Sequence, residues 1–235
     1  NGTWDFAFDS LDVGLKQKWF ADVNQIDGNI QVPFSWAAPL SGQKNLADIA
    51  WYHKKVKVSR SWSQKRTFIV IGASDWETSV YFDGKLLGTH QGGYTPFSFD
   101  LTPYLQYDKE QSLVIRVDDK RRDFTLYGKQ GYGDARGIWQ TVYLESRGQD
   151  FLESFQISPD IDKESIHVKA IFPSVTSKTL TLKTHIKTKE GITFHKEIPR
   201  GTKEIEFTIP VPKPRLWTLE DPYLYDYQVD LGDGD

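Results

Sequence analysis

The sequence has 235 residues, with 29 Lys and Arg against 32 Asp and Glu, which gives a formal net charge of −3. A composition that is 38% hydrophobic and 26% charged is typical of a globular protein and excludes a disordered tail or a collagen-like polymer. No apolar run approaches the ~18 residues of a membrane helix, the charge is balanced without basic blocks, and cysteine is absent. These features argue against a membrane-spanning protein, a nucleic-acid partner, a thiol nucleophile and a disulfide scaffold.

The dominant hydrophobic period along the chain is two, which indicates β-strands. Residues 67–72 are apolar throughout and predict a strand covered on both faces. Asp83-Gly84 between apolar runs predicts a two-residue hairpin turn. Apolar residues alternate with polar ones in 112–117, 166–172 and 205–209, as in strands with one buried face. Because no segment combines a helical period with helix caps, the sequence predicts an all-β protein with few, short helices.

A domain boundary is expected near residues 146–150. A predicted strand over 141–145 ends there, and a new set of strands begins at residues 151–157. Seven of the eight Trp precede this point, so the composition changes with it. The sequence therefore predicts two domains, residues 1–148 and 149–235, the second near the size of an immunoglobulin-like sandwich.

No recognisable catalytic or metal motif stands in the sequence. The segment 72–76 fails the last position of a Gly-x-Ser-x-Gly nucleophile elbow, and the five His residues lack metal-ligand spacing. The glycine-rich segment 128–133 lacks the lysine-serine ending of a phosphate-binding loop. We therefore predict no catalytic residue, no metal site and no cofactor in this chain.

Two adjacent carboxylates follow the predicted strand that ends at Val117. Asp118 and Asp119 stand where a loop leaves the strand, a position at which functional residues gather. Adjacent strand residues point to opposite faces, so the two cannot form a facing acid/base pair. Asp118 is interpreted as a residue that caps the strand end, and Asp119 as a candidate for function.

Aromatic residues allow two interpretations, because sugar rings stack on them but β-sandwich cores also use them. Trp62 has polar neighbours and is expected to be partly exposed. Residues 88–97 hold three Gly and a Pro, which predicts a shaped loop that is either a binding loop or a corner. The Trp residues expected in the core are Trp4, Trp36, Trp51, Trp139 and Trp217.

Six segments in order resemble the non-catalytic front part of glycoside hydrolase family 2 enzymes, the group of β-galactosidases, β-glucuronidases and β-mannosidases. They are Gly2-Thr3-Trp4-Asp5-Phe6, the Val-Pro-x-x-Trp match at 32–36, Trp51-Tyr52, the hairpin and Gly-Gly-Tyr-x-Pro-Phe stretch within 80–105, residues 137–145, and residues 214–225. The resemblance implies a jelly-roll (galactose-binding-like) sandwich followed by an immunoglobulin-like sandwich.

The same resemblance implies that the catalytic machinery lies elsewhere. These enzymes retain anomeric configuration with two glutamates on a following (β/α)₈ barrel. The chain has no Asn-Glu pair, no alternating strand-helix pattern and no room for ~250 barrel residues. The expectation is a fragment of a glycosidase that does not hydrolyse glycosides alone. Its expected partners are a C-terminal catalytic barrel and, through the full-length enzyme, a carbohydrate substrate, and a homo-oligomer is possible.

The resemblance also implies which residues approach the substrate. In family members, loops of the first domain reach the mouth of the barrel, which directs attention to Asp48 before Trp51-Tyr52 and to Asp119. Tyr132, within the long stretch 120–133, is the third candidate for lining the cleft. A carboxylate in such a position accepts hydrogen bonds from sugar hydroxyls and orients the ring.

Two other functions remain open at this point. A free-standing carbohydrate-binding module predicts an exposed aromatic platform, for which Trp62, Tyr94 and Tyr132 are the residues to test. A structural adaptor for another subunit is the third reading. The chain has no Met and opens inside a structured pattern, so we expect processing or excision, and a removed secretion signal would fit a secreted or periplasmic enzyme. The compartment itself is left open.

Overall fold

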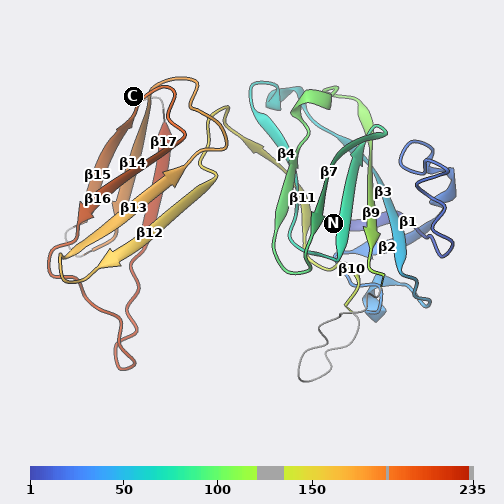
Figure 1. Cartoon of the computed structure of the whole chain (residues 1–235), viewed down its shortest axis with the longest axis horizontal. Helices are drawn as coiled ribbons and strands as arrows, with labels where there is room; N and C mark the ends of the chain where they lie inside the picture. Colours follow the sequence, from blue (N-terminus) through green and yellow to red (C-terminus); the bar gives the residue numbers. More distant parts are fainter. Residues whose placement is uncertain (121–134, 189–190, 233–235) are drawn as a thin grey trace. The chain divides into compact units, whose positions relative to one another are not determined.

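The chain divides into two compact units, unit 1 (residues 1–147) and unit 2 (residues 148–235), each made of antiparallel β-sheets (Figure 1). The computed structural model describes residues 1–120, 135–188 and 191–232. Within these ranges the helices are single 3₁₀ turns of three residues. The predicted all-β class with few, short helices is confirmed.

Unit 1 contains one large sheet and two smaller ones. The six-stranded sheet has the order β2-β1-β3-β9-β6-β7, the three-stranded sheet the order β11-β4-β8, and β10 pairs with β5. The elements are β1 (Gly2–Phe8), η1 (Val23–Gln25), β2 (Gly28–Val32), η2 (Pro39–Ser41), β3 (Ile49–Lys57), η3 (Arg60–Trp62), β4 (Arg66–Ile71), β5 (Ser74–Asp75), β6 (Glu77–Phe82), β7 (Lys85–Gln91), β8 (Phe97–Asp100), η4 (Thr102–Tyr104), β9 (Glu110–Asp118), β10 (Gly137–Ile138) and β11 (Val142–Arg147).

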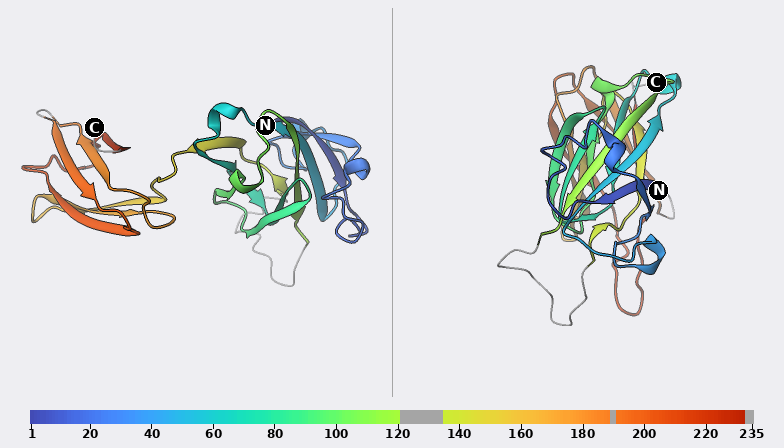
Figure 2. Two further views of the ribbon diagram at one scale, coloured as in Figure 1. Left: turned by 90° about the horizontal axis from the view of Figure 1, so that it is seen from above. Right: turned by 90° about the vertical axis from the view of Figure 1, so that its right-hand side faces the viewer.

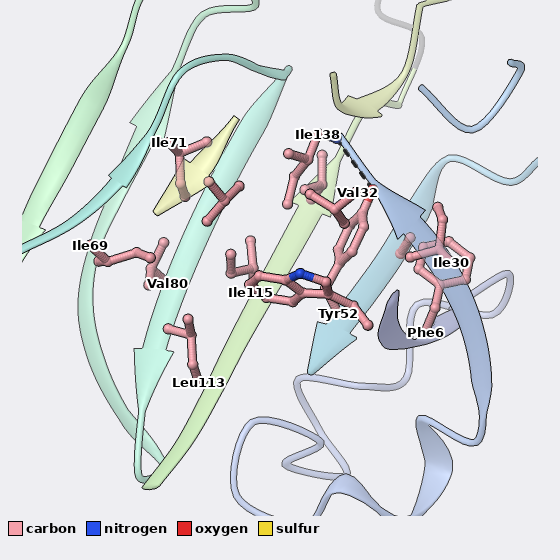
Figure 3. Close-up of a cluster of buried hydrophobic side chains, with 14 of the residues drawn as sticks. Phe6, Ile30, Val32, Tyr52, Ile69, Ile71, Val80, Leu113, Ile115 and Ile138 are labelled. Atoms are coloured by element: carbon pink, nitrogen blue, oxygen red, sulfur yellow. Dashed lines mark hydrogen bonds between the residues drawn. The ribbon is translucent and has the colours of Figure 1, made fainter. Parts of the chain in front are cut away.

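Figure 2 shows the sheets of unit 1 as separate layers. The main core of unit 1 lies between its two larger sheets (Figure 3). Figure 3 shows Tyr52 of β3 and Ile115 of β9 among side chains from the facing sheet, such as Ile69 and Ile71 of β4. Leu113, Ile115 and Val117 all belong to this core, as the alternation over 112–117 predicts. Alternate residues of a strand share a face, so these three side chains are buried together. The prediction that the other face of this strand is solvated is wrong, because Val114 and Arg116 are buried there.

A second apolar cluster covers the outer face of the six-stranded sheet. Trp51, Tyr81 and Val114 pack there against Trp19 and Ile26, which come from the segment that joins β1 to β2. The first half of β3 is therefore buried on both faces, which explains why residues 49–52 form an uninterrupted apolar run.

Unit 2 is a sandwich of two three-stranded sheets. Their orders are β12-β13-β16 and β15-β14-β17. Inward side chains of the segments 166–172 and 205–209 form the core, as their alternation predicts. The strands are β12 (Ser154–Asp160), β13 (Ser165–Ile171), β14 (Leu180–Ile186), β15 (Ile192–Ile198), β16 (Glu204–Pro210) and β17 (Tyr227–Gly232).

Trp217 contradicts the expectation that it is a core residue. Its side chain is 55% exposed, in the connection between β16 and β17, where Leu219 and Leu224 are also exposed. An apolar stretch in the sequence does not reveal whether the segment lies over a sheet face or projects from it. The sequence therefore predicts an apolar segment here correctly, but its burial wrongly.

Candidate functional site at the strand ends of unit 1

Asp48 and Asp119 lie side by side at one end of the six-stranded sheet. β3 begins where β9 ends, with Ile49 opposite Asp118. The ladder continues one residue further, because the amide of Asp119 donates to the carbonyl of Asp48 at 2.8 Å. Two candidates that stand 71 positions apart in the sequence thus come from neighbouring strand ends.

A buried arginine joins the two carboxylates. Nη1 of Arg136 donates to Oδ1 of Asp48 at 2.7 Å and to the carbonyl of Ala47 at 3.1 Å. Nε of Arg136 lies 3.4 Å from Oδ2 of Asp119. The side chain of Arg136 is 8% exposed, against 54% for Asp48 and 23% for Asp119. The guanidinium therefore holds both carboxylates from the buried side, while Asp48 faces solvent.

The backbone of Arg136 is held by the Val-Pro-x-x-Trp segment. Its amide donates to Oγ of Ser35 at 3.0 Å, and its carbonyl accepts from the amide of Trp36 at 3.0 Å. Val32 and Pro33 of the same segment are joined by a cis peptide bond. This motif thus has a local structural role in placing the arginine.

The residues after Arg136 are anchored in the core. Gly137 has φ +78°, and a Cβ there would lie 2.1 Å from Nε1 of Trp36, so only glycine fits. The buried hydroxyl of Tyr52 accepts a hydrogen bond from the amide of Ile138 at 3.2 Å and another from Nε1 of Trp36. Burial raises the pKa of Tyr52. The phenol therefore stays neutral and couples Arg136 to the core.

Asp118 belongs to a different polar network. Nη2 of Arg116 donates to Oδ2 of Asp118 at 2.8 Å and to Oδ1 of Asp12 at 3.3 Å. The amide of Lys120 donates to Oδ1 of Asp118, as expected of a residue that caps a strand end. A hydrogen bond from Lys120 lowers the pKa of Asp12, and the same bond raises the pKa of Lys120. Asp118 and Asp119 have different partners, consistent with side chains that leave the strand on opposite faces.

Asp48 borders a pocket of about 300 Å³, a volume sufficient for a small ligand. Carboxylates and a lysine in this pocket can accept and donate hydrogen bonds to a hydroxylated molecule. Arg136 lies within 3.4 Å of both Asp48 and Asp119 and holds both carboxylates in ion pairs. The arrangement therefore suits ligand positioning. The lining residues are Asp9, Ser10, Asp12, Leu46, Ala47, Asp48, Ile49 and Lys120.

Sequence reasoning and structure agree only partly on this site. The structure brings Asp48 and Asp119 together, whereas Tyr132 lies outside the described residues. Arg136 was missed, because the contacts that bury it come from residues 88–101 positions away and leave no local signal. Within residues 1–120, 135–188 and 191–232, no three His, Asp or Glu side chains gather as a metal site requires, and no helix is long and apolar enough to cross a membrane.

Two family models match nearly the whole chain. Residues 1–147 match the sugar binding domain of glycosyl hydrolases family 2, and residues 151–235 match a second domain of glycosyl hydrolases family 2. The two matches correspond to the two sandwiches.

Curated relatives are much longer than this chain. A β-galactosidase of Thermoanaerobacter pseudethanolicus is 27% identical over 200 residues, which are 78% of this chain and 26% of the relative. A putative β-glucuronidase of Formosa agariphila is 25% identical over 221 residues, 86% of this chain and 26% of the relative. The chain spans about a quarter of the length of these relatives.

Solved structures of the same fold include two β-glucuronidases. That of Bacteroides uniformis has a TM-score of 0.75 and 25% identity, covering 98% of this chain and 29% of the other. That of Ruminococcus gnavus has a TM-score of 0.76 and 18% identity, covering 97% of this chain and 41% of the other. The predicted succession of a jelly-roll and an immunoglobulin-like sandwich is confirmed.

Proposed function

Because this chain belongs to glycosyl hydrolase family 2, we propose that it is the non-catalytic part of a retaining exo-β-glycosidase and that the strand ends of unit 1 contribute to its substrate cleft. The relatives are a β-galactosidase and a putative β-glucuronidase, of which about three quarters lie outside the match. In this proposal, a separate catalytic domain carries the acid/base and the nucleophile, and this chain braces it.

The observation that carries the proposal is the pair of carboxylates fixed by Arg136. Asp48 is exposed at the mouth of a pocket, yet one of its oxygens is held at 2.7 Å by a buried guanidinium. A side chain held in this way loses little freedom when a ligand arrives, so its hydrogen bonds contribute more of their free energy to binding. Sugar hydroxyls are suitable donors for such acceptors.

The proposal assigns separate roles to the three residues. Asp48 accepts hydrogen bonds from the sugar ring in the innermost subsite, and Asp119 supports it from the neighbouring strand end. Arg136 is a positioning residue, because it acts through the two carboxylates. Substrate orientation of this kind raises the rate without taking part in proton transfer.

The first test compares this chain with the complete gene product. Both are assayed on the p-nitrophenyl β-D-galactoside, β-D-glucuronide and β-D-mannoside. We expect the complete product to hydrolyse at least one of them and this chain alone to hydrolyse none. A folded complete product that is inactive on all three, or activity in this chain alone, would contradict the proposal.

The second test removes the carboxylates in the complete product. Asp48→Asn and Asp119→Asn each remove a charge-assisted hydrogen bond worth about 1.5–3 kcal/mol, so kcat/KM is expected to fall roughly 10- to 100-fold. Glu110→Gln is the matched control, because Glu110 is exposed at the opposite end of the same strand, β9. Unchanged kcat/KM in both Asp variants would refute the proposal that the strand ends of unit 1 contribute to the substrate cleft.

A further inference from the structure

Tyr94 is presented to solvent by a short, well-anchored loop between β7 and β8. Its side chain is 82% exposed. The amide of Gly92 donates to the carbonyl of Trp76 at 3.1 Å, and Nε1 of Trp139 donates to the carbonyl of Gly93 at 2.8 Å. The rings of Tyr94 and Trp139 meet at 70° with centroids 5.8 Å apart. An aromatic ring that is both exposed and anchored offers an apolar face to a ligand at little entropic cost.

The carboxylate of Asp75 lies directly behind this loop. A Cβ on Gly93 would come within 2.8 Å of Oδ1 of Asp75, so glycine is what allows the two to approach. Among the residues that the structure describes, no group donates a hydrogen bond to the Asp75 side chain. Burial raises the pKa of Asp75, opposed by the charge of Arg136. Because Asp75 is only half-buried, its carboxylate oxygens can still accept a hydrogen bond from a donor outside the chain.

Strand pairing connects this group to the site described above. Asp75 of β5 is opposite Gly137 of β10, the residue that follows Arg136. Unit 1 thus brings together the exposed ring of Tyr94, the ring of Trp139 and a carboxylate that receives no hydrogen bond from the residues described in the structure. An apolar face beside such an acceptor is complementary to a sugar ring, which has a face of C–H groups and a rim of hydroxyl donors.

We propose that Tyr94, Trp139 and Asp75 form a binding subsite for a neutral pyranose. The C–H face of the sugar stacks on Tyr94, Trp139 closes one side, and a hydroxyl donates to the Asp75 carboxylate. A uronic acid is disfavoured, because its carboxylate would approach that of Asp75. The subsite shares no contact residue with Asp48 and Asp119, so it stands independently of the function proposed for them.

The experiment is a titration of the ¹⁵N-labelled chain with methyl β-D-galactopyranoside and, separately, with the methyl β-glycoside of glucuronic acid. The neutral glycoside is expected to shift the Trp139 indole and Gly93 amide signals saturably, with a Kd on the order of 1–10 mM. Tyr94→Ala should weaken binding at least tenfold and Asp75→Asn several-fold. Tyr143→Ala, which removes another exposed aromatic side chain of unit 1, should leave binding unchanged.

Three results would overturn the subsite: no saturable shift, binding that survives Tyr94→Ala, or equal affinity for the uronic acid. Asp48→Asn separates the two proposals, because it should not alter these shifts. If Asp48→Asn abolishes binding and Tyr94→Ala does not, the sugar occupies the pocket at Asp48, which refutes this inference and supports the proposed function. Since Tyr94 is largely exposed, its replacement should leave the fold intact, which the remaining amide signals report.

Discussion

Unit 1 and unit 2 are both two-layered sandwiches, but different side chains stabilise their cores. Unit 1 buries Trp4, Trp36 and Trp51. Two of these rings donate hydrogen bonds inside it, Nε1 of Trp36 to the hydroxyl of Tyr52 and Nε1 of Trp51 to Asp9 at 3.1 Å. The core of unit 2 is mainly aliphatic, with Phe172 as its most deeply buried aromatic residue and no buried Trp. The candidate site therefore belongs to the unit whose buried aromatic side chains also make hydrogen bonds.

Polar pairs follow the same division. In unit 1, His53 is buried and lies 2.7 Å from Asp5, and Arg116 and Arg136 are buried with carboxylate partners. In unit 2, Lys169 pairs with Glu204 and Glu206 on the surface of a sheet, where the two carboxylates are about half exposed. Burying polar groups costs free energy unless each finds its partner, and it fixes geometry when it does. Unit 1 therefore buries charged pairs that fix geometry, whereas the buried polar side chains described in unit 2 are neutral, such as Thr176, whose hydroxyl donates to the carbonyl of Pro199 at 3.0 Å.

The largest effect is expected from removing a core ring in unit 1. Trp36→Ala should lower its free energy of unfolding by about 3–5 kcal/mol, because it leaves a cavity and frees the Tyr52 hydroxyl. Phe172→Ala, equally buried in unit 2, is the matched change. Hydrogen exchange with mass spectrometry reports the units separately, and each variant should lose protection only in its own unit. Simultaneous loss in both would show that the two cores unfold as one.

A smaller effect is expected from the Tyr52 hydroxyl alone. Tyr52→Phe keeps the ring but leaves Nε1 of Trp36 and the amide of Ile138 without their acceptor, which should cost about 1–3 kcal/mol. Urea unfolding at neutral pH measures this. Tyr143→Phe, at an exposed position, should leave the free energy of unfolding unchanged. An equally small effect of Tyr52→Phe would mean that apolar burial, and not the hydrogen bonds of the Tyr52 hydroxyl, stabilises this core.

A still smaller effect, of opposite sign, is expected at Asp75. Its pKa is raised above the ordinary value of 3.8 in the folded state, so its contribution to stability is complete below that pH and is lost as the pH rises through the folded-state pKa. Asp75→Asn should therefore be more stable than the parent at pH 7, by less than about 1 kcal/mol because solvent screens the group. Urea unfolding at pH 7, 5 and 4 should show the difference shrinking as the pH falls. A difference that grows on acidification would refute this account.

The smallest effect is expected on the surface of unit 2. Lys169→Met removes a cation from two exposed carboxylates, and exposed ion pairs of this kind contribute little to stability. The midpoint of urea unfolding should not move measurably, in 50 mM or in 500 mM NaCl. A clear loss of stability would show that unit 2, like unit 1, depends on specific polar contacts.

The strands could be predicted from the sequence because the period of two follows directly from which face is buried. Leu113, Ile115 and Val117 share a core, and residues 67–71 of β4 are buried throughout, as expected. The turn at Asp83-Gly84 joins β6 to β7 as predicted. Each of these features depends on neighbours in the chain alone.

The site could be predicted only in part, because it depends on register between distant strands. Nothing near Asp48 in the sequence indicates that it lies beside Asp119, since that contact follows from the pairing of Ile49 with Asp118. Arg136 has no periodic neighbours, and its burial results from contacts with residues about a hundred positions away. Trp217 shows the reverse error, because its local pattern suggested burial that the tertiary structure does not provide.

The burial of β3 on both faces has a consequence for how this site can evolve. Tyr52 faces one cluster and Trp51 the other, so a shift of one residue in the pairing would exchange them and disrupt both. The backbone beneath Asp48 and Asp119 is therefore held still while their side chains are free to change. Under the proposed function, new ligand preferences at this edge should arise by substitution at fixed positions, and insertions or deletions within β3 should be selected against.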